Sequence, residues 1–200
     1  MTFKIFLAVA LGILVGALGL MDQLAAHMDS LITLGLSVML LLAGVEIGRQ
    51  GKVFAQIRKY GLSLLLVPLS VALGSILGAI AAGMLFQMPV AEAAAIGAGF
   101  GWYSFSAVEL AKHSAELGTL AFITNIAREL MALVSIPFIA KHIGYLEAIA
   151  PGGATTMDTT LPLLAKSTDG TTAMIGFITG MLLSLAVPIL VPMIMGFFAG

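Results

Sequence analysis

The sequence predicts an all-α polytopic membrane protein with six to seven transmembrane segments, two of them discontinuous or re-entrant, and with a structural repeat. Of the 200 residues, 60% are hydrophobic and only 10% are charged, whereas soluble domains are about 25% charged. The mean hydropathy is +1.11. Several apolar stretches reach the roughly 20 residues that a helix needs to cross a bilayer, so the chain has little room for anything but membrane spans.

The composition also excludes several classes of function. Nine basic residues stand against ten acidic residues, a balance that does not favour binding to nucleic acid. The absence of cysteine excludes disulfides, thiolate catalysis and cysteine-ligated zinc. The motifs of intramembrane enzymes are missing, and Ser104 and His113 would lie about 13 Å apart on a continuous helix. We therefore expect a transporter and not an enzyme, with no catalytic residues, metal or cofactor.

Five apolar stretches are expected to cross the membrane: Phe3–Met21, Leu31–Gly48, Gly61–Phe86, Leu117–Ala140 and Thr171–Gly200. A signal peptide is the alternative for the first stretch, but further spans follow it and no cleavage motif leads into a soluble chain. We expect one integral membrane transport domain over residues 1–200. It divides into a two-span N-terminal part, 1–60, and a repeat-like part with two broken segments, 61–200.

Positive charge predicts the orientation of the chain. One short loop holds Arg49, Lys52, Arg58 and Lys59, and basic loops stay in the cytoplasm. Counting back from this loop puts the N-terminus in the cytoplasm, and counting forward through seven crossings puts the C-terminus outside. Later basic residues are too evenly spread to add to this argument. We expect a multi-pass protein of the inner (cytoplasmic) membrane.

Two apolar segments, Ala91–Ala111 and Pro151–Ser167, are interrupted. The first contains the run GAGFGWYSFS from Gly97; no strand precedes it, which argues against a phosphate loop. Tight packing through small residues is one alternative. The other is a helix that unwinds inside the membrane, which is tolerated only where the backbone is buried in protein or lines a wet cavity. We expect the second, with Trp102, Tyr103 and Ser104 at the transport path.

The second interrupted segment contains the run PGGATTMDTTLP from Pro151. Its prolines and paired glycines restrict regular helix, and its threonines surround Asp158, so it predicts a cation site; a polar outer loop is the alternative. Gly97 and Pro151 are 54 residues apart, and interrupted segments at matching places in two halves indicate a transporter site near the membrane midplane. Residue identity between the halves is poor, so the repeat is a structural expectation.

The stretch Leu117–Ala140 carries Asn125, Arg128 and Glu129 in its middle. Each charge costs roughly 2.5–3.5 kcal/mol at the centre of a spanning helix. Because neighbouring residues point about 100° apart on a helix, each charge needs a partner on another segment. The alternative is a buried ion pair that only fixes helix packing. With Glu109 and Asp158, Glu129 forms an expected surplus of acids at membrane depth, which suits a cationic substrate or a proton relay.

Three motifs carry a resemblance to a known family. GFGWYS from Gly99, NIAREL from Asn125 and GATTMDTTLP from Gly153 occur in the order seen in the bacterial lysine exporter family (LysO type), and the resemblance covers essentially the whole chain. It implies export of L-lysine and its toxic analogues across the inner membrane. Longer members have an extra N-terminal hydrophobic region that this chain lacks. The protein could therefore act alone, as a homodimer, or with a small separately encoded membrane subunit.

The expected function is secondary active export of lysine by proton antiport. Asp158 or Glu129 would bind the substrate ammonium, and the second acid would carry the coupling proton. Arg128 or a half-helix N-terminus would bind the substrate carboxylate. The other candidate site residues are Asn125, Glu109, Thr155, Thr156, Thr159, Trp102, Tyr103 and Ser104. A cation–proton antiporter or organic-anion carrier of similar broken-helix architecture, and a membrane subunit that does not itself transport, are the alternatives.

Overall fold

The computed structural model of the chain describes residues 62–198 continuously and scattered helical positions between residues 11 and 45. The chain divides into two compact units, Met1–Arg49 and Gln50–Gly200, and the functional argument concerns the second. Most of the two expected N-terminal spans, and the whole basic loop from Arg49 to Lys59, lie outside the described residues.

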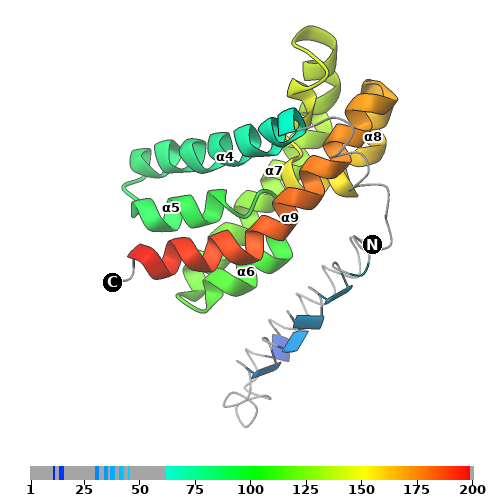
Figure 1. Ribbon diagram of the computed structural model, residues 1–200. Helices are drawn as coiled ribbons and strands as arrows, with labels where there is room; N and C mark the ends of the chain where they lie inside the picture. The colour runs from blue at the N-terminus through cyan, green and yellow to red at the C-terminus, as the bar shows by residue number, and fades with distance from the viewer. Residues whose placement is uncertain are drawn as a thin grey trace. The chain divides into compact units, whose positions relative to one another are not determined.

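Every regular element between residues 62 and 198 is helical (Figure 1), and the expected all-α membrane fold is confirmed. The elements are η2 (Leu62–Leu65), α4 (Leu66–Leu85), α5 (Val90–Gly97), α6 (Tyr103–Ala111), α7 (Ala115–His142), η3 (Glu147–Ile149), η4 (Gly153–Met157), α8 (Leu161–Ser167) and α9 (Gly170–Phe198). Within this part of the chain, α4, α7 and α9 are long and apolar enough to cross a membrane. Both ends of each of these helices lie within a few residues of the ends of the apolar stretch that predicts the helix.

The ends of these helices follow from local sequence. Ser114 caps α7 by accepting a hydrogen bond from the amide of Leu117 at 3.0 Å. The last turn of α7 contains Lys141 and His142, which favours the negative end of the helix dipole. Figure 1 shows α9 bending in its C-terminal half, where Pro188 and Pro192 interrupt its backbone hydrogen bonds.

The first interrupted segment, α5 and α6, forms a hairpin. α5 begins beside the end of α4, where a Cβ added to Gly83 would touch Ala93. α6 ends beside the start of α7, where a Cβ added to Gly118 would touch Ala111. In Figure 1 the α4–α5 turn, the α6–α7 turn and the C-terminal end of α9 all lie on the left side. The first hairpin therefore returns to the end from which it came, as a re-entrant segment would.

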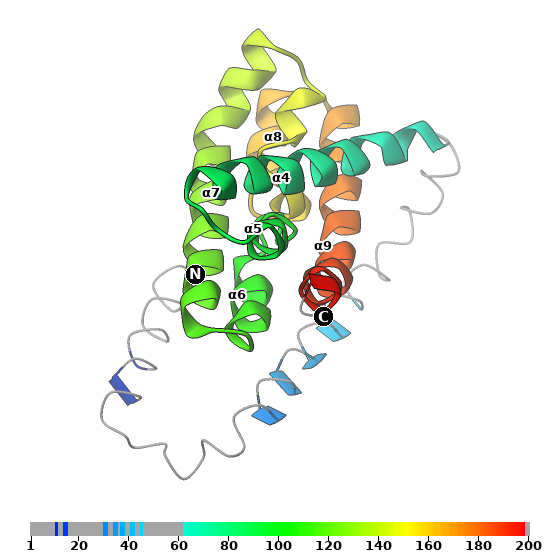
Figure 2. The ribbon, with the colours of Figure 1, turned by 90° about the vertical axis from the view of Figure 1, so that its left-hand side faces the viewer.

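The second interrupted segment, from η3 to α8, forms a hairpin from the opposite end. A Cβ on Gly176, near the start of α9, would touch Leu164 of α8, whereas one on Gly180, a turn further along, would touch the backbone of Met157. The second hairpin thus descends from the end of α7 to η4 and returns along α8 to the start of α9. Figure 2 shows α8 between the upper parts of α7 and α9.

A buried apolar cluster holds the second hairpin against α7. Its members are Ala132, Ile136 and Ala140 of α7, Ala148 and Ile149 of η3, and Leu164 of α8. Leu164 and Ile149 are fully buried. This packing brings residues 150–160, the tip of the second hairpin, to the level of Arg128 in the middle of α7.

Candidate functional site

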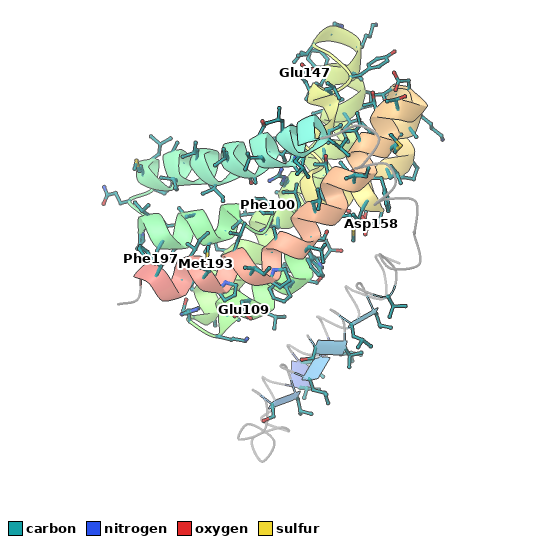
Figure 3. The ribbon with its side chains drawn as sticks, viewed as in Figure 1. Phe100, Glu109, Glu147, Asp158, Met193 and Phe197 are labelled. Atoms are coloured by element: carbon teal, nitrogen blue, oxygen red, sulfur yellow. The ribbon has the colours of Figure 1, made fainter. Side chains whose placement is uncertain are left out.

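The tips of the two hairpins meet. The carbonyl oxygen of Phe100 accepts a hydrogen bond of 2.9 Å from the amide of Ala154, and Figure 3 shows Phe100 near the middle of the bundle. The backbone is left-handed at Phe100 (φ 49°), Gly101 (φ 97°) and Gly153 (φ 58°). Glycine adopts this conformation without the steric cost that other residues bear. The glycines of both sequence runs therefore allow the tight turns that bring the tips together.

Asn125 of α7 holds the first tip. Its buried carboxamide oxygen accepts a hydrogen bond of 2.7 Å from the amide of Gly101. Its Nδ2 donates to the carbonyl oxygens of Ile96 at 3.3 Å and Ala121 at 2.9 Å. The bonds to Gly101 and Ile96 satisfy backbone groups at the break between α5 and α6, which is how a buried chain break avoids unpaired polar groups, while the bond to Ala121 lies within α7.

Arg128 holds the second tip and reaches the first. Its Nε donates to the carbonyl oxygen of Pro151 at 3.1 Å, and Nη2 donates to that of Ala150 at 3.0 Å. Its Nη1 donates to the hydroxyl of Ser75 at 2.6 Å, and this hydroxyl donates to the carbonyl oxygen of Gly97 at 2.7 Å. No carboxylate pairs with Arg128 among the described residues. Its partners lie on other segments, as expected, but they are neutral oxygens.

Glu129 faces a different group of residues. Its half-buried carboxylate lies near the side chain of Thr159 and is close enough to Asp158 for the two charges to interact. Both acids also act electrostatically on the hydroxyl of Tyr103. The Thr159 hydroxyl lies 3.2 Å from Oδ1 of Asp158, so it is within reach of both acids. We call these four residues, Tyr103, Glu129, Asp158 and Thr159, the acid cluster.

The other threonines of the second tip are used inside it. The hydroxyl of Thr156 lies 2.7 Å from the carbonyl oxygens of both Gly153 and Gly176, and so joins the tip to α9. The hydroxyl of Thr155 donates to the carbonyl oxygen of Gly152 at 2.9 Å and lies 3.2 Å from that of Thr160. Because Thr155 and Thr156 are both buried, they stabilise the tip, whereas Asp158 and Thr159 are exposed.

Three further candidate site residues, Glu109, Trp102 and Ser104, are not part of the acid cluster. Glu109 is near the end of α6 and forms an ion pair of 2.6 Å with Lys112, and Figure 3 shows it well separated from Asp158. Trp102 packs on Phe105 with ring centroids 5.4 Å apart, and Ser104 is exposed in the first turn of α6. The structure therefore does not bring Glu109 into the acid cluster, while Trp102 and Ser104 flank Tyr103 in sequence.

A cavity of about 790 Å³ lies between α4 and α7 on the side of Arg128. Ser75, Gly97, Asn125, Arg128 and Pro151 are among its lining residues, and the acid cluster is not. Ser75, which lines this cavity and bonds Arg128, was not singled out by the sequence. A serine in an apolar helix is common in membrane bundles, and the only available signal was its place in the middle of a span.

Three helices long and apolar enough to cross a membrane, with two opposed hairpins that meet at their tips, form an arrangement typical of membrane transporters. The chain belongs to the lysine exporter LysO family, whose model matches residues 6–195. This membership agrees with the expected class, a membrane transporter.

Two relatives support the assignment. The lysine exporter LysO of Escherichia coli (strain K12) is 30% identical over 193 residues, which cover 95% of this chain. The chain spans 62% of that relative's length. A relative from Haemophilus influenzae, also named for lysine export, is 32% identical over 145 residues, which cover 68% of this chain and 74% of the relative. No solved structure matches the chain.

Proposed function

We propose that this protein exports L-lysine by exchange for protons, with the acid cluster as the binding site for the substrate ammonium. The acid cluster is the observation that carries the proposal. It contains two carboxylates without a basic partner among the described residues, at the point where the two hairpins meet. The names of the relatives supply the substrate, and the surplus of negative charge supports a cation.

The acid cluster also offers a means of coupling. Two carboxylates close together repel one another, and a proton bound to one of them relieves that repulsion. A bound lysine ammonium neutralises the same charge. Lysine and the proton therefore compete for Glu129 and Asp158, and this competition is sufficient for exchange transport.

The substrate carboxylate needs a positive partner close to the acid cluster. Arg128 already donates to three oxygens and lies on the cavity side of α7. The other expected partner is a half-helix N-terminus, and α6 begins at Tyr103 with no side-chain cap. We assign the substrate carboxylate to the first amides of α6, near Ser104, where the helix dipole is positive.

The remaining parts of the proposal concern setting and partners. We propose that the chain lies in the inner membrane with its N-terminus in the cytoplasm, and that toxic lysine analogues share the path. A homodimer, or a complex with a small separate membrane subunit, is the proposed assembly where the chain does not act alone. Purification in mild detergent followed by mass measurement distinguishes these assemblies.

Transport in proteoliposomes tests the function. Purified protein is reconstituted with labelled lysine on one side, with and without a pH gradient. We expect lysine movement that the gradient accelerates, together with counter-movement of protons reported by a pH-sensitive dye. Lysine movement without proton movement would overturn the antiport. Movement of Na⁺ or K⁺ in place of lysine would establish the alternative, a cation–proton antiporter.

A further inference from the structure

Equivalent positions in the two hairpins and the helices before them are 53 residues apart in the sequence. Ser75 of α4 bonds Gly97, 22 residues later, at the end of the first arm of the first hairpin. Arg128 of α7 bonds Ala150, also 22 residues later, at the end of the first arm of the second hairpin. Ser75 and Arg128 are themselves 53 residues apart. The same shift relates Phe100 to Gly153, and both are left-handed.

Ser75 and Arg128 thus occupy equivalent places in the two repeats and touch each other at 2.6 Å. Where two-fold symmetry relates two units, a residue contacts its own equivalent only close to the axis. The hairpins come from opposite ends of the bundle, so the axis lies across the direction of the crossing helices, as in inverted repeats. The Ser75–Arg128 contact marks this axis.

The two equivalent residues differ in chemistry, and the difference matters. A hydroxyl supplies one hydrogen bond, whereas the guanidinium supplies several in a fixed fork. Arg128 binds the second tip directly and the first tip through Ser75. Its guanidinium is held by the carbonyl oxygens of Ala150 and Pro151 and by the Ser75 hydroxyl, all of them neutral groups. One side chain on the axis therefore ties both hairpins together.

We infer that Arg128 and Ser75 are positioning residues for transport: they form an axial clamp that sets how the two tips sit against each other, and Arg128 does not contact the substrate. This inference rests on the proposed lysine export. It assigns Arg128 a different role from that of a ligand for the substrate carboxylate. The clamp and the acid cluster lie on different sides of α7, since the residues of the cluster do not line the cavity beside Arg128.

The clamp predicts a particular pattern of kinetic defects. Ser75→Ala and Arg128→Lys should lower the maximal rate of lysine exchange by roughly five- to tenfold, as expected for the loss of one or two hydrogen bonds. The KM for lysine should stay within about twofold of the wild-type value. Ser75→Thr, which keeps the hydroxyl, should restore most of the rate. Ser70→Ala, on the same helix and lining the same cavity, is the matched control and should transport normally.

Cadaverine, which is lysine without its carboxylate, separates the clamp from a substrate ligand. Both compounds are used to inhibit exchange of labelled lysine by wild type, Ser75→Ala and Arg128→Lys. The ratio of the two inhibition constants should be the same in all three proteins. A ratio that collapses toward one in Arg128→Lys would show that Arg128 binds the substrate carboxylate, and wild-type rates in both variants would show that no clamp is needed.

Hydrogen exchange tests the clamp without any transport. In Ser75→Ala, amides of residues 97–103 and of residues 150–156 should both exchange faster than in wild type, because the clamp joins the two tips. Faster exchange in the first segment alone would overturn the inference, since Ser75 would then support only its own hairpin. A wild-type protein that fails to move lysine would refute the proposed function and leave this measurement intact.

Discussion

The carbonyl oxygen of Phe100 and the amide of Ala154, which belong to hairpins entering from opposite ends, are joined by a hydrogen bond of 2.9 Å. A break in a membrane helix exposes backbone groups that lipid cannot satisfy. Here each tip satisfies part of this need for the other, with Asn125 and Arg128 supplying further partners. The two interruptions are therefore mutually dependent, and a change in one tip should be felt in the other.

We expect Gly153→Ala to destabilise the tips. A Cβ at Gly153 would lie 2.5 Å from the oxygen of Phe100 and 2.8 Å from Nη2 of Arg128, and a left-handed alanine costs a further 1–2 kcal/mol or so. Thermal unfolding in detergent should show a clear loss of stability. Gly170→Ala, at the start of α9 with open space around it, is the control and should be neutral. Equal stability of both variants would contradict the tip geometry.

The acids of the cluster should be essential for export. We expect Asp158→Asn and Glu129→Gln to reach the membrane normally and to lose roughly 10- to 100-fold or more of lysine export, because each removes a charged partner of the ammonium. Asp158→Glu should keep partial activity with a shifted pH optimum. Glu109→Gln breaks only the ion pair with Lys112, worth about 0–1 kcal/mol, and should export normally. Full export by Asp158→Asn would remove Asp158 from the site.

Substitution by valine should affect stability at one threonine of the second tip and lysine binding at another. Thr156→Val removes the buried hydroxyl that joins the second tip to α9, which should cost about 1–3 kcal/mol of stability. Thr159→Val alters an exposed residue of the acid cluster and should leave stability unchanged while raising the KM for lysine by roughly fivefold. Unfolding curves and lysine exchange measured on both variants decide the matter, and a reversed pattern would mean that the two side chains are misassigned.

The cap of α9 predicts an acid-sensitive element of stability. Oδ1 of Asp169 accepts a hydrogen bond of 2.7 Å from the amide of Thr172, and this bond lowers the pKa of Asp169 below its ordinary value. The ionised cap therefore stabilises the folded protein fully above the ordinary aspartate pKa of about 4. This stabilisation is lost as the pH falls from there through the lowered value.

The measurement for this cap is the unfolding temperature as a function of pH. Wild type should lose more stability than Asp169→Asn between about pH 6 and about pH 2, since asparagine also caps helices but does not ionise. Parallel curves for the two proteins would show that the charge of Asp169 contributes nothing.

The hairpins predict a distinctive pattern of surface labelling. The chain has no cysteine, so single cysteines can be placed at Phe86, His113, Tyr145 and Lys166, which are all exposed. An impermeant thiol reagent should label positions 86 and 113 from one side of the membrane and positions 145 and 166 from the other. If both interrupted segments crossed the membrane, position 86 would share a side with 145, and 113 with 166.

Much of the fold could be predicted because apolar length and backbone breakers leave strong signals. The long helices coincide with the apolar stretches, and Gly97 and Pro151, 54 residues apart, nearly give the register of 53 that the contacts define. The sequence did not predict whether each interrupted segment crosses the membrane or returns to the side from which it came. That outcome depends on which helices the two arms of the segment pack against.

The candidate site was harder to predict. The separation of Arg128 from Glu129 follows from helix geometry, but the partners of Arg128 are backbone oxygens, which have no sequence signal. Thr156 and Thr159 are three residues apart and chemically identical, and only the folded tip decides which one is buried. The expectation for Glu109 neglected Lys112, three residues later, which is the spacing of a helical ion pair.

A hairpin that enters and leaves by the same end changes the depth of the chain but never its compartment. Between residues 62 and 198 the helices long and apolar enough to cross a membrane are α4, α7 and α9. Because their number is odd, we expect residues 62 and 198 to face opposite compartments in either orientation of insertion. The same count assigns the lysines of this region to sides of the membrane. We expect Lys141 and Lys166 to share a compartment with the start of α4, and Lys112 to lie on the opposite side beside its acidic partner Glu109. With seven crossings the basic residues after residue 62 are spread evenly over both sides of the membrane. With three crossings more of them fall on the side of Lys141 and Lys166, which favours a cytoplasmic location for the C-terminal end of α7.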